Sequence, residues 1–364
     1  MIAQFFGSAN CYWYADKQYP CSIDAMTPDL TPQRLSTLFD AIDDVRILVV
    51  GDLMLDVYLR GSASRISPEA PVPVVRVSKE VHAPGGAANV AANVLALGAA
   101  CTVVGCIGSD QAGDELGRAL EEAGADSSSI YRHTTRPTTV KTRLMVRHQQ
   151  VARFDQEVED DMDGQCVDDI CAAIESAARH AHVMVVEDYD KGICTPRVID
   201  AVLDASQRFG LPLVVDPKHR RFFDYRGATV FKPNRLELAA GLRAPVLADD
   251  PAWMERTRRQ LDCGSLLVTL GEEGMALMTE EGQFLRIPAM AREVFDVSGA
   301  GDTVTAVVAT ALAAGASMVE AAILANYAAG IEVGKPGVKP VRREELLTAV
   351  HAEDPGIATL SMTK

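Results

Sequence analysis

Short runs of aliphatic, mostly β-branched residues recur along the chain and constrain its fold more than any other feature. They lie at residues 46–51, 101–105, 183–187, 213–216, 229–232 and 266–271. Their apolar residues are consecutive and do not alternate with polar ones, which is typical of strands buried on both faces. Helical patterns that end at Gly98 and Gly124 lie between some of them. We therefore expect an α/β fold whose mostly parallel sheet binds ligands beyond the carboxyl ends of its strands.

Two further segments do not fit this pattern and predict a small separate β-layer. Residues 71–77 are extended and contain prolines that suit only an edge strand. Residues 139–147 alternate between apolar and polar positions, and residues 151–155 form the return strand of a hairpin. We expect this layer, from about 57–82 and 138–156, to project from the α/β core as a lid.

The start of the chain differs in pattern from the remainder. Residues 1–43 carry aromatic side chains among polar residues, with little periodicity until residue 35. We expect an N-terminal extension over these residues, to which the pattern assigns no role. Residues 44–350 are expected to form one α/β domain that carries the lid, and residues 351–364 a C-terminal tail.

The chain is acidic, with 35 Lys and Arg residues, 50 Asp and Glu residues and a net charge of −15. Nucleic-acid binding needs a basic surface, so this balance argues against it, whereas a small anionic ligand needs only a local basic pocket. Because no apolar run reaches the length of a membrane span, we expect no membrane partner. The N-terminus lacks the pattern of a secretory signal, and the eight cysteines lack zinc-site spacing. We therefore expect a cytoplasmic protein with free thiols.

The segment from Asp296 to Thr303 is the most informative for chemistry. Gly299, Ala300 and Gly301 are small, and they open a helix whose first N–H groups are free to bind an anion. A carboxylate at such a site repels a bound phosphate. Asp302 is therefore best explained as a base that takes a proton from a hydroxyl group attacking a phosphoryl group. The structural alternative is that the glycines only permit tight packing and that Asp302 starts the helix.

Two further patterns suggest a site for a polyhydroxylated ligand. Gly85 and Gly86 allow close backbone approach, and the amide of Asn89 can both donate and accept hydrogen bonds. Asp52 and Asp56 follow the first predicted strand, where paired carboxylates could accept hydrogen bonds from sugar hydroxyls. The structural alternatives are a turn with a capping asparagine and acids in a solvated loop.

Other phosphate-binding motifs fail on inspection. Residues 330–335 are one residue short of a P-loop and are followed by Pro336. Residues 299–304 lack the third glycine of the dinucleotide-binding motif and come late in the chain. The absence of that motif after the first strand counts against an NAD-dependent dehydrogenase, the alternative from a different enzyme class.

The glycine pair with Asn89 and the segment 296–302 resemble the two signatures of the ribokinase-like (PfkB) carbohydrate kinases. Within that family, residues 51–56, 64–75, 149–153 and 188–192 resemble the branch that phosphorylates a heptose 7-phosphate, and the resemblance covers about residues 44–345. It implies a ribokinase-like three-layer α/β/α fold with a mostly parallel central sheet and a small β-sheet lid.

The resemblance implies ATP-dependent phosphorylation of O1 of D-glycero-β-D-manno-heptose 7-phosphate to the 1,7-bisphosphate. This reaction belongs to ADP-heptose synthesis for the lipopolysaccharide core. ATP and Mg²⁺ are the implied cofactors. The resemblance leaves undecided whether a monovalent cation binds near Asp296. The alternatives within this fold are a kinase for another sugar or sugar phosphate, and a sugar-binding regulator without turnover.

The resemblance also implies roles for individual residues. Asp302 corresponds to the catalytic base, and Gly299, Ala300 and Gly301 to the anion hole. The positions implied for the sugar are Asp52, Asp56, Gly85, Gly86 and Asn89. The positions implied around the nucleotide are Lys218, Asn234, Glu237, Thr269, Gly271 and Asn326, with Glu237 near Mg²⁺.

A dianionic substrate in an acidic protein needs local cations. Lys141, Arg143 and Arg153 lie on the predicted hairpin of the lid, and Lys191 and Lys218 follow predicted core strands. We hypothesise that some of them hold the 7-phosphate of the substrate; the alternative is a solvated lid face.

Two partner expectations follow from the resemblance. The lid is expected to form a homodimer interface. Related proteins often carry a C-terminal nucleotidyltransferase domain with a His-x-Gly-His motif, and this chain ends at Lys364 without one. We therefore expect a separate nucleotidyltransferase to act next in the pathway.

Overall fold

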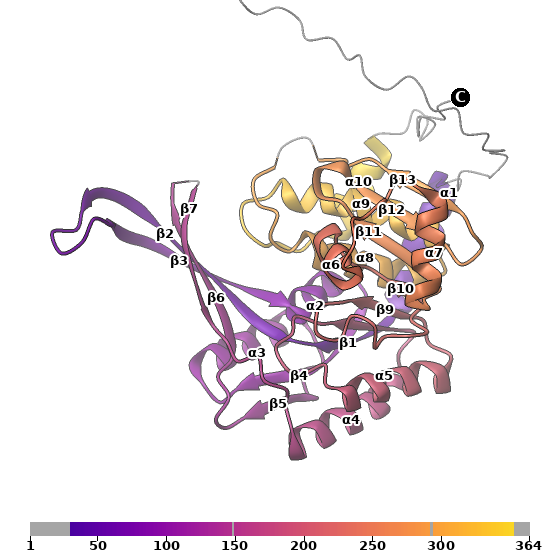
Figure 1. Ribbon diagram of the computed structural model, residues 1–364, viewed down its shortest axis with the longest axis horizontal. Helices are drawn as coiled ribbons and strands as arrows, with labels where there is room; N and C mark the ends of the chain where they lie inside the picture. Colours follow the sequence, from indigo (N-terminus) through magenta and orange to yellow (C-terminus); the bar gives the residue numbers. More distant parts are fainter. Residues whose placement is uncertain (1–29, 148, 292–293, 353–364) are drawn as a thin grey trace, which may run out of the picture.

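A mostly parallel sheet forms the centre of the computed structural model, which describes residues 30–147, 149–291 and 294–352 (Figure 1). Its strand order is β13-β12-β11-β10-β9-β8-β1-β4-β5, and only the pairs β11–β12 and β12–β13 are antiparallel. The strands are β1 (Arg46–Gly51), β4 (Ala100–Gly108), β5 (Ile130–His133), β8 (Val183–Glu187), β9 (Leu213–Asp216), β10 (Val230–Phe231), β11 (Ser265–Thr269), β12 (Met275–Met278) and β13 (Phe284–Ile287). Each predicted apolar run lies in a strand of this sheet, so the predicted fold class is confirmed.

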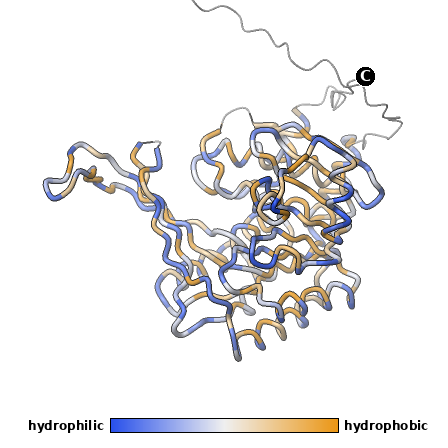
Figure 2. Tube along the Cα trace, viewed as in Figure 1, coloured by the Kyte–Doolittle hydropathy of each residue, from blue (hydrophilic) through white to orange (hydrophobic). Residues whose placement is uncertain are grey.

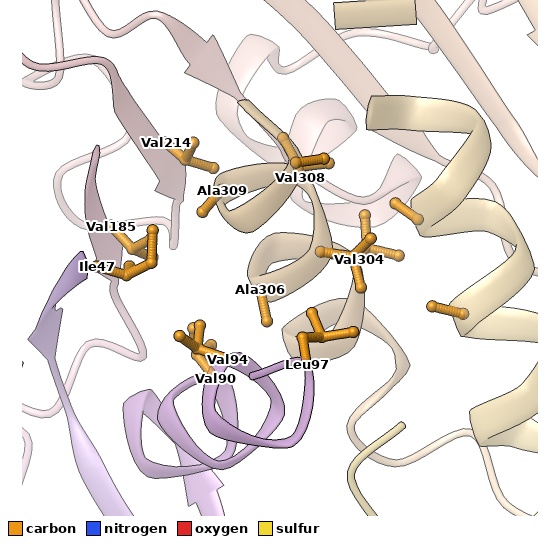
Figure 3. Close-up of a cluster of buried hydrophobic side chains, with 14 of the residues drawn as sticks. Ile47, Val90, Val94, Leu97, Val185, Val214, Val304, Ala306, Val308 and Ala309 are labelled. Atoms are coloured by element: carbon orange, nitrogen blue, oxygen red, sulfur yellow. The ribbon is translucent and has the colours of Figure 1, made fainter. Parts of the chain in front are cut away.

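Helices cover both faces of the sheet and produce two hydrophobic cores. One core lies beneath α1 (Pro32–Ala41), α2 (Ala87–Ala96), α3 (Gln111–Ala123), α8 (Ala300–Ala313), α9 (Met318–Val333) and α10 (Arg343–Ala352). The other lies beneath α4 (Gly164–Ala178), α5 (Pro196–Phe209), α6 (Arg235–Leu242) and α7 (Pro251–Leu261). In Figure 3, Ile47, Val185 and Val214 of the sheet face Val90 of α2 and Ala309 of α8.

The outer helices are amphipathic, as a three-layer arrangement requires. In Figure 2 the traces of α4 and α5 alternate between hydrophobic and hydrophilic residues. Helix α5 buries Val198, Ile199 and Val202, and it ends at Gly210, which has the left-handed conformation that favours glycine. The middle layer therefore loses contact with water on both faces, which explains its continuous apolar strands.

The predicted lid is a four-stranded sheet of order β3-β2-β6-β7, and Figure 1 shows its long ribbon of β2 and β3 projecting from the α/β body. Its strands are β2 (Leu53–Ile66), β3 (Pro73–Gly86), β6 (Thr139–Val146) and β7 (Gln149–Gln156). β3 is an edge strand, as its prolines predict. The first segment is longer than the expected 57–82, because residues 53–58 are buried against the core and continue the ladder. Asp56 therefore lies buried in β2, directly after the first strand, and not in the solvated loop that was its structural alternative.

Packing continues across the predicted boundary at residue 43. Leu35, Leu38 and Phe39 of α1 belong to the core, and Arg34 forms an ion pair with Glu320 of α9 at 2.7 Å. The described part of the expected extension is thus joined to the α/β body, whereas residues 1–29 and 353–364 lie outside the described residues. No helix in the described ranges is long and apolar enough to cross a membrane.

Candidate active site

A pocket of about 670 Å³ lies beyond the carboxyl ends of β9, β10 and β11 and against the N-terminus of α8. It brings together ten of the residues expected from the sequence, namely Lys218, Asn234, Glu237, Thr269, Gly271, Gly299, Ala300, Gly301, Asp302 and Asn326. Apart from Lys218, the residues expected around the sugar and its phosphate lie outside this lining. The position of the pocket is the one that a parallel sheet predicts.

The N-terminus of α8 forms the part of the pocket suited to an anion. Gly299 has φ +90°, and a Cβ there would lie 2.8 Å from Asn89 Nδ2. A larger residue would therefore be strained and would push against Asn89. Since the first N–H groups of a helix have no partner within the helix, Ala300 and Gly301 present backbone donors to the pocket.

Asp302, in the first turn of α8, is only 4% exposed and accepts two hydrogen bonds. Asn89 Nδ2 donates to Oδ2 and Tyr189 Oη donates to Oδ1, each at 2.8 Å. Burial raises the pKa of Asp302 to about 6, although the bonds from Asn89 and Tyr189 lower it. A base with this pKa is ionised at neutral pH and can still accept a proton, as general-base catalysis requires.

The hydrogen bond from Tyr189 leads to a testable prediction. Tyr189→Phe removes a donor to the ionised form of Asp302, so the pKa of Asp302 should rise further above about 6. We expect the acidic limb of the pH profile of kcat to move to higher pH. Tyr225→Phe is the matched control, because Tyr225 Oη donates at 2.7 Å to Asp188 and not to Asp302. An identical acidic limb in Tyr189→Phe and wild type would contradict the prediction.

The loop that carries Tyr189 is held by Asp52. The backbone N–H groups of Tyr189, Lys191 and Ile193 donate to its carboxylate at 2.7, 3.0 and 3.2 Å. Asp52 is 1% exposed, so its oxygens face this loop. We therefore propose that Asp52 positions the loop, in place of the sugar contact expected for it.

Buried charged groups lie at the inner end of the pocket: Asp216, Lys232 and Asp302 line it, and Glu187, which is not part of the lining, lies beside them. Glu187, Asp216 and Asp302 each offer a carboxylate oxygen, and these oxygens lie within 4.8 Å of one another. Lys232 is 2% exposed and its Nζ lies 2.8 Å from Asp216 Oδ2. Sequence reasoning did not assign Glu187, Tyr189, Asp216 or Lys232 to the site. The sequence feature that could have identified them is their position at or just after the carboxyl end of a predicted strand.

Asn234 and Glu237 form the N-terminal cap of α6. Asn234 Oδ1 accepts from the backbone N–H of Glu237 at 2.9 Å, and Glu237 Oε2 accepts from that of Asn234 at 2.8 Å. The other oxygen of Glu237 contacts Lys218 Nζ. Within the described residues, the carboxylate cluster suited to a metal ion does not include Glu237.

On the lid side, two basic residues of β6 lie near Asp56, and one of them, Lys141, also lies against Tyr189. Arg143 Nη1 lies 2.5 Å from Asp56 Oδ1, and Lys141 Nζ lies 4.8 Å from the centroid of the Tyr189 ring. A Cβ on Gly85 would lie 2.8 Å from Asp56 Oδ2, so this glycine permits close contact between β3 and β2. Asp56, Gly85, Lys141 and Arg143 thus lie close together, and their roles in sugar or phosphate binding stay predictions.

The other basic residues of the predicted cluster have different surroundings. Lys191 Nζ forms ion pairs with Glu157 and Glu159 at 3.0 and 2.8 Å, and its ammonium is thereby directed to the segment that follows the lid. The half-exposed Arg153 forms an ion pair with Asp155 on its own strand. Lys191 and Arg153 are therefore already paired with acids, and the role of the basic residues in holding the 7-phosphate stays a prediction.

Most of the chain matches a known protein family. Residues 45–344 match the model of the pfkB family carbohydrate kinases. The chain belongs to this family. Membership sets aside the NAD-dependent dehydrogenase that the sequence left as an alternative.

Curated relatives cover the same region. The chain is 42% identical over 323 residues to the bifunctional protein HldE of Geotalea uraniireducens (strain Rf4), covering 88% of this chain and 66% of that protein. HldE of Pseudomonas aeruginosa (strain PAO1) is 44% identical over 316 residues, covering 85% and 65%. The chain thus spans slightly less than two thirds of the length of these relatives.

Solved structures share the fold at low sequence identity. Arabidopsis thaliana ribokinase complexed with ribose and ATP has a TM-score of 0.67 at 22% identity, covering 84% of this chain and 98% of that one. Escherichia coli phosphofructokinase-2 in complex with potassium has a TM-score of 0.70 at 18% identity, covering 85% and 99%. These likenesses confirm the expected ribokinase-like architecture.

Proposed function

We propose that this pfkB-family protein transfers the γ-phosphoryl group of ATP to O1 of D-glycero-β-D-manno-heptose 7-phosphate. The observation that carries the proposal is Asp302, a buried carboxylate with a pKa of about 6 at the N-terminus of α8. It lies between the backbone donors of the anion hole and Asn89, next to the lid. A base beside a phosphate-binding helix terminus is the arrangement that hydroxyl phosphorylation needs.

We assign each part of the reaction to particular residues of the chain. The backbone N–H groups of Ala300 and Gly301 receive the transferred phosphoryl group, and Lys232 and Lys218 add positive charge at the nucleotide side. Asp302 accepts the proton of the attacking hydroxyl group. Bound Mg²⁺ would further neutralise the phosphate charge, and the pocket's carboxylate oxygens are ligands that it prefers.

The test is ADP release with ATP, Mg²⁺ and a panel of sugars and sugar phosphates that includes the heptose 7-phosphate. Turnover confined to this compound is the expected result. Turnover on another sugar would keep the kinase and exclude the substrate. Absence of turnover with every sugar, in folded protein that binds ATP, would contradict the proposal and favour a sugar-binding regulator.

Lys141 is the residue that we propose for the 7-phosphate. Among the described residues it has no carboxylate within ion-pair distance, whereas Arg143 is paired with Asp56. Lys141→Met should raise KM for the sugar phosphate about 10–100-fold, since a hydrogen bond to a charged group contributes about 1.5–3 kcal/mol. KM for ATP should change little. Arg147→Met, in the exposed turn that follows the same strand, is the control. Equal effects of Lys141→Met on both KM values would refute the role.

We also propose a homodimer formed through the lid. Its strands expose large apolar side chains at Ile66, Val77, Val151 and Phe154, the last 54% exposed. Phe154→Glu should raise the dimer dissociation constant at least ~30-fold if Phe154 is a central contact, because such residues contribute about 2 kcal/mol or more. Sedimentation would measure this. Phe223→Glu, on the α/β body, should leave the dimer intact, and a monomeric wild type would refute the proposal.

The proposal of a monovalent cation near Asp296 is supported by one feature. Glu332 of α9 is buried, neither of its oxygens has a hydrogen-bond partner, and a Cβ on Gly299 would lie 3.4 Å from Oε1. Burial and the nearby Asp296 and Asp302 raise the pKa of Glu332 to about 8. A cation beside Asp296 would offset this negative charge behind the anion hole. The separate nucleotidyltransferase and the cytoplasmic location rest on the resemblance and composition alone.

A further inference from the structure

Asn93 is a buried polar residue of α2 to which the proposed reaction gives no role. It lies one helical turn after Asn89, and the residue is 1% exposed. Its neighbours along the helix are alanine and valine, and α2 packs against α8. A buried amide is stable only when its donors and its acceptor have partners, so the partners of Asn93 show how its amide is oriented.

Backbone groups fix the orientation of the Asn93 amide. The backbone N–H of Val341 donates to Asn93 Oδ1 at 3.1 Å, and Asn93 Nδ2 donates to the backbone carbonyl oxygen of Asn89 at 3.0 Å. A backbone N–H can only donate and a backbone carbonyl can only accept, so only one orientation satisfies both. Thr303 Oγ1 also donates to Asn93 Oδ1, at 3.3 Å.

The orientation of Asn93 in turn determines that of Asn89. Asn93 Nδ2 also donates to Asn89 Oδ1 at 3.1 Å, so the nitrogen of the Asn89 amide faces Asp302 and donates to Oδ2 at 2.8 Å. If the Asn89 amide were reversed, two amide groups would face each other as donors, and its oxygen would face a carboxylate. Both contacts would leave buried polar groups without hydrogen bonds, which is unfavourable.

We infer that Asn93 is a positioning residue of the active site, which fixes the side-chain amide of Asn89 so that its N–H donates to Asp302. Asn93 acts through Asn89, because the lining of the pocket within the described residues does not include Asn93. With its oxygen held by Asn93, Asn89 can offer only its second N–H to a ligand and would contact a substrate oxygen as a donor. The consequence for catalysis rests on the proposed kinase function.

A double-mutant cycle tests whether Asn93 acts through Asn89. Water that enters in Asn93→Ala can donate or accept, so the Asn89 amide should no longer be fixed. We expect kcat/KM for the sugar phosphate to fall about 10-fold and KM for ATP to change little. In the Asn89→Ala background, Asn93→Ala should have no further effect on kcat/KM, because no amide is left to orient.

Val94→Ala is the matched control for this cycle. It makes the same truncation at the next position of α2, where the side chain is also buried. It should lower Tm through lost packing but leave kcat/KM and both KM values unchanged.

A second measurement requires no turnover. Protein labelled with ¹⁵N-asparagine gives few side-chain amide signals in NMR spectra, and Asn89→Ala identifies the signal of Asn89. The asparagines of the sequence are Asn10, Asn89, Asn93, Asn234 and Asn326. In the wild type the buried N–H that donates to Asp302 should exchange slowly with water, and Asn93→Ala should speed this exchange at least ~10-fold. Val94→Ala should exchange as the wild type does.

Three results would each overturn the inference: Asn93→Ala with the same kinetic constants as Val94→Ala, an equal effect of Asn93→Ala in the Asn89→Ala background, or unchanged exchange of the Asn89 amide. If Asn93→Ala folds poorly, Asn93→Leu replaces it in both measurements with the same expectations, since leucine fills the space but offers neither donor nor acceptor. A wild type inactive on the heptose 7-phosphate, with exchange that still depends on Asn93, would refute the proposed substrate and support the positioning role.

Discussion

Asp302→Asn is expected to lower kcat by ~10²–10⁴-fold, the usual contribution of a general base. The substitution keeps the size of the side chain, and the amide oxygen can accept from Asn89 while the amide NH₂ donates to Tyr189 Oη. The amide cannot take the proton of the attacking hydroxyl group. The anion hole and both lysines stay in place, so ATP should bind with nearly unchanged affinity. ADP release at saturating substrate, with ATP binding measured separately, checks the prediction.

The pH profile sharpens this prediction. Because the pKa of Asp302 is raised to about 6, kcat of the wild type should fall as the pH drops through that value and the base becomes protonated. The residual activity of Asp302→Asn should lack this acidic limb. Asp190→Asn is the control, since Asp190 is a nearby acid with φ +57°, a conformation that asparagine tolerates. A kcat reduced equally in both variants would show that Asp302 is not the base.

Lys232→Met is expected to lower the free energy of unfolding by about 3–5 kcal/mol, the usual effect of breaking a buried ion pair from one side. The ammonium of Lys232 is fully enclosed, and its removal leaves Asp216 close to Glu187 and Asp302 without a paired cation. Methionine fills a similar volume, so the loss of stability would come mainly from removing the charge. Chemical denaturation, with equal m values in both proteins, measures it.

Two further variants separate the charge effect from packing. Lys335→Met makes the same change at the more exposed pair with Glu345 and should cost at most ~1 kcal/mol. The double variant Lys232→Met with Asp216→Asn should recover part of the stability, because no uncompensated carboxylate is left at position 216. If Lys232→Met cost no more than Lys335→Met, the pair would not have the role assigned here.

Local sequence patterns were sufficient for the layers of the fold and for the helix start that carries the proposed anion hole. The apolar runs became central strands because residues without polar neighbours on either face are stable only in the middle layer. Gly299 to Asp302 could be recognised because a helix start, small residues and an acid are all local features. The lid hairpin around 139–156 was predictable for the same reason, since adjacent strands pair through a short turn.

Longer-range contacts explain the corrections. Helix α1 looked unlike the rest of the chain, but it packs into the core, and its Arg34 pairs with Glu320, 286 residues away. The sequence indicated that Asp56 follows the first strand, but not that it lies in a second strand, because that strand alternates little. Its neighbours on β3 and β6 are what extend the lid sheet down to Leu53.

The sequence by itself determined the α/β class, the lid, the family resemblance and the choice of Asp302 as the proposed base. Only the tertiary structure decided which charges meet at the site. Tyr189 reaches Asp302 across 113 positions of the chain, and Asp52 reaches the Tyr189 loop across 137. Such contacts depend on strand register and on the position of α8 over the sheet. The cost of burying each charge depends on the partners brought to it in the folded molecule, which residue type and spacing alone do not specify.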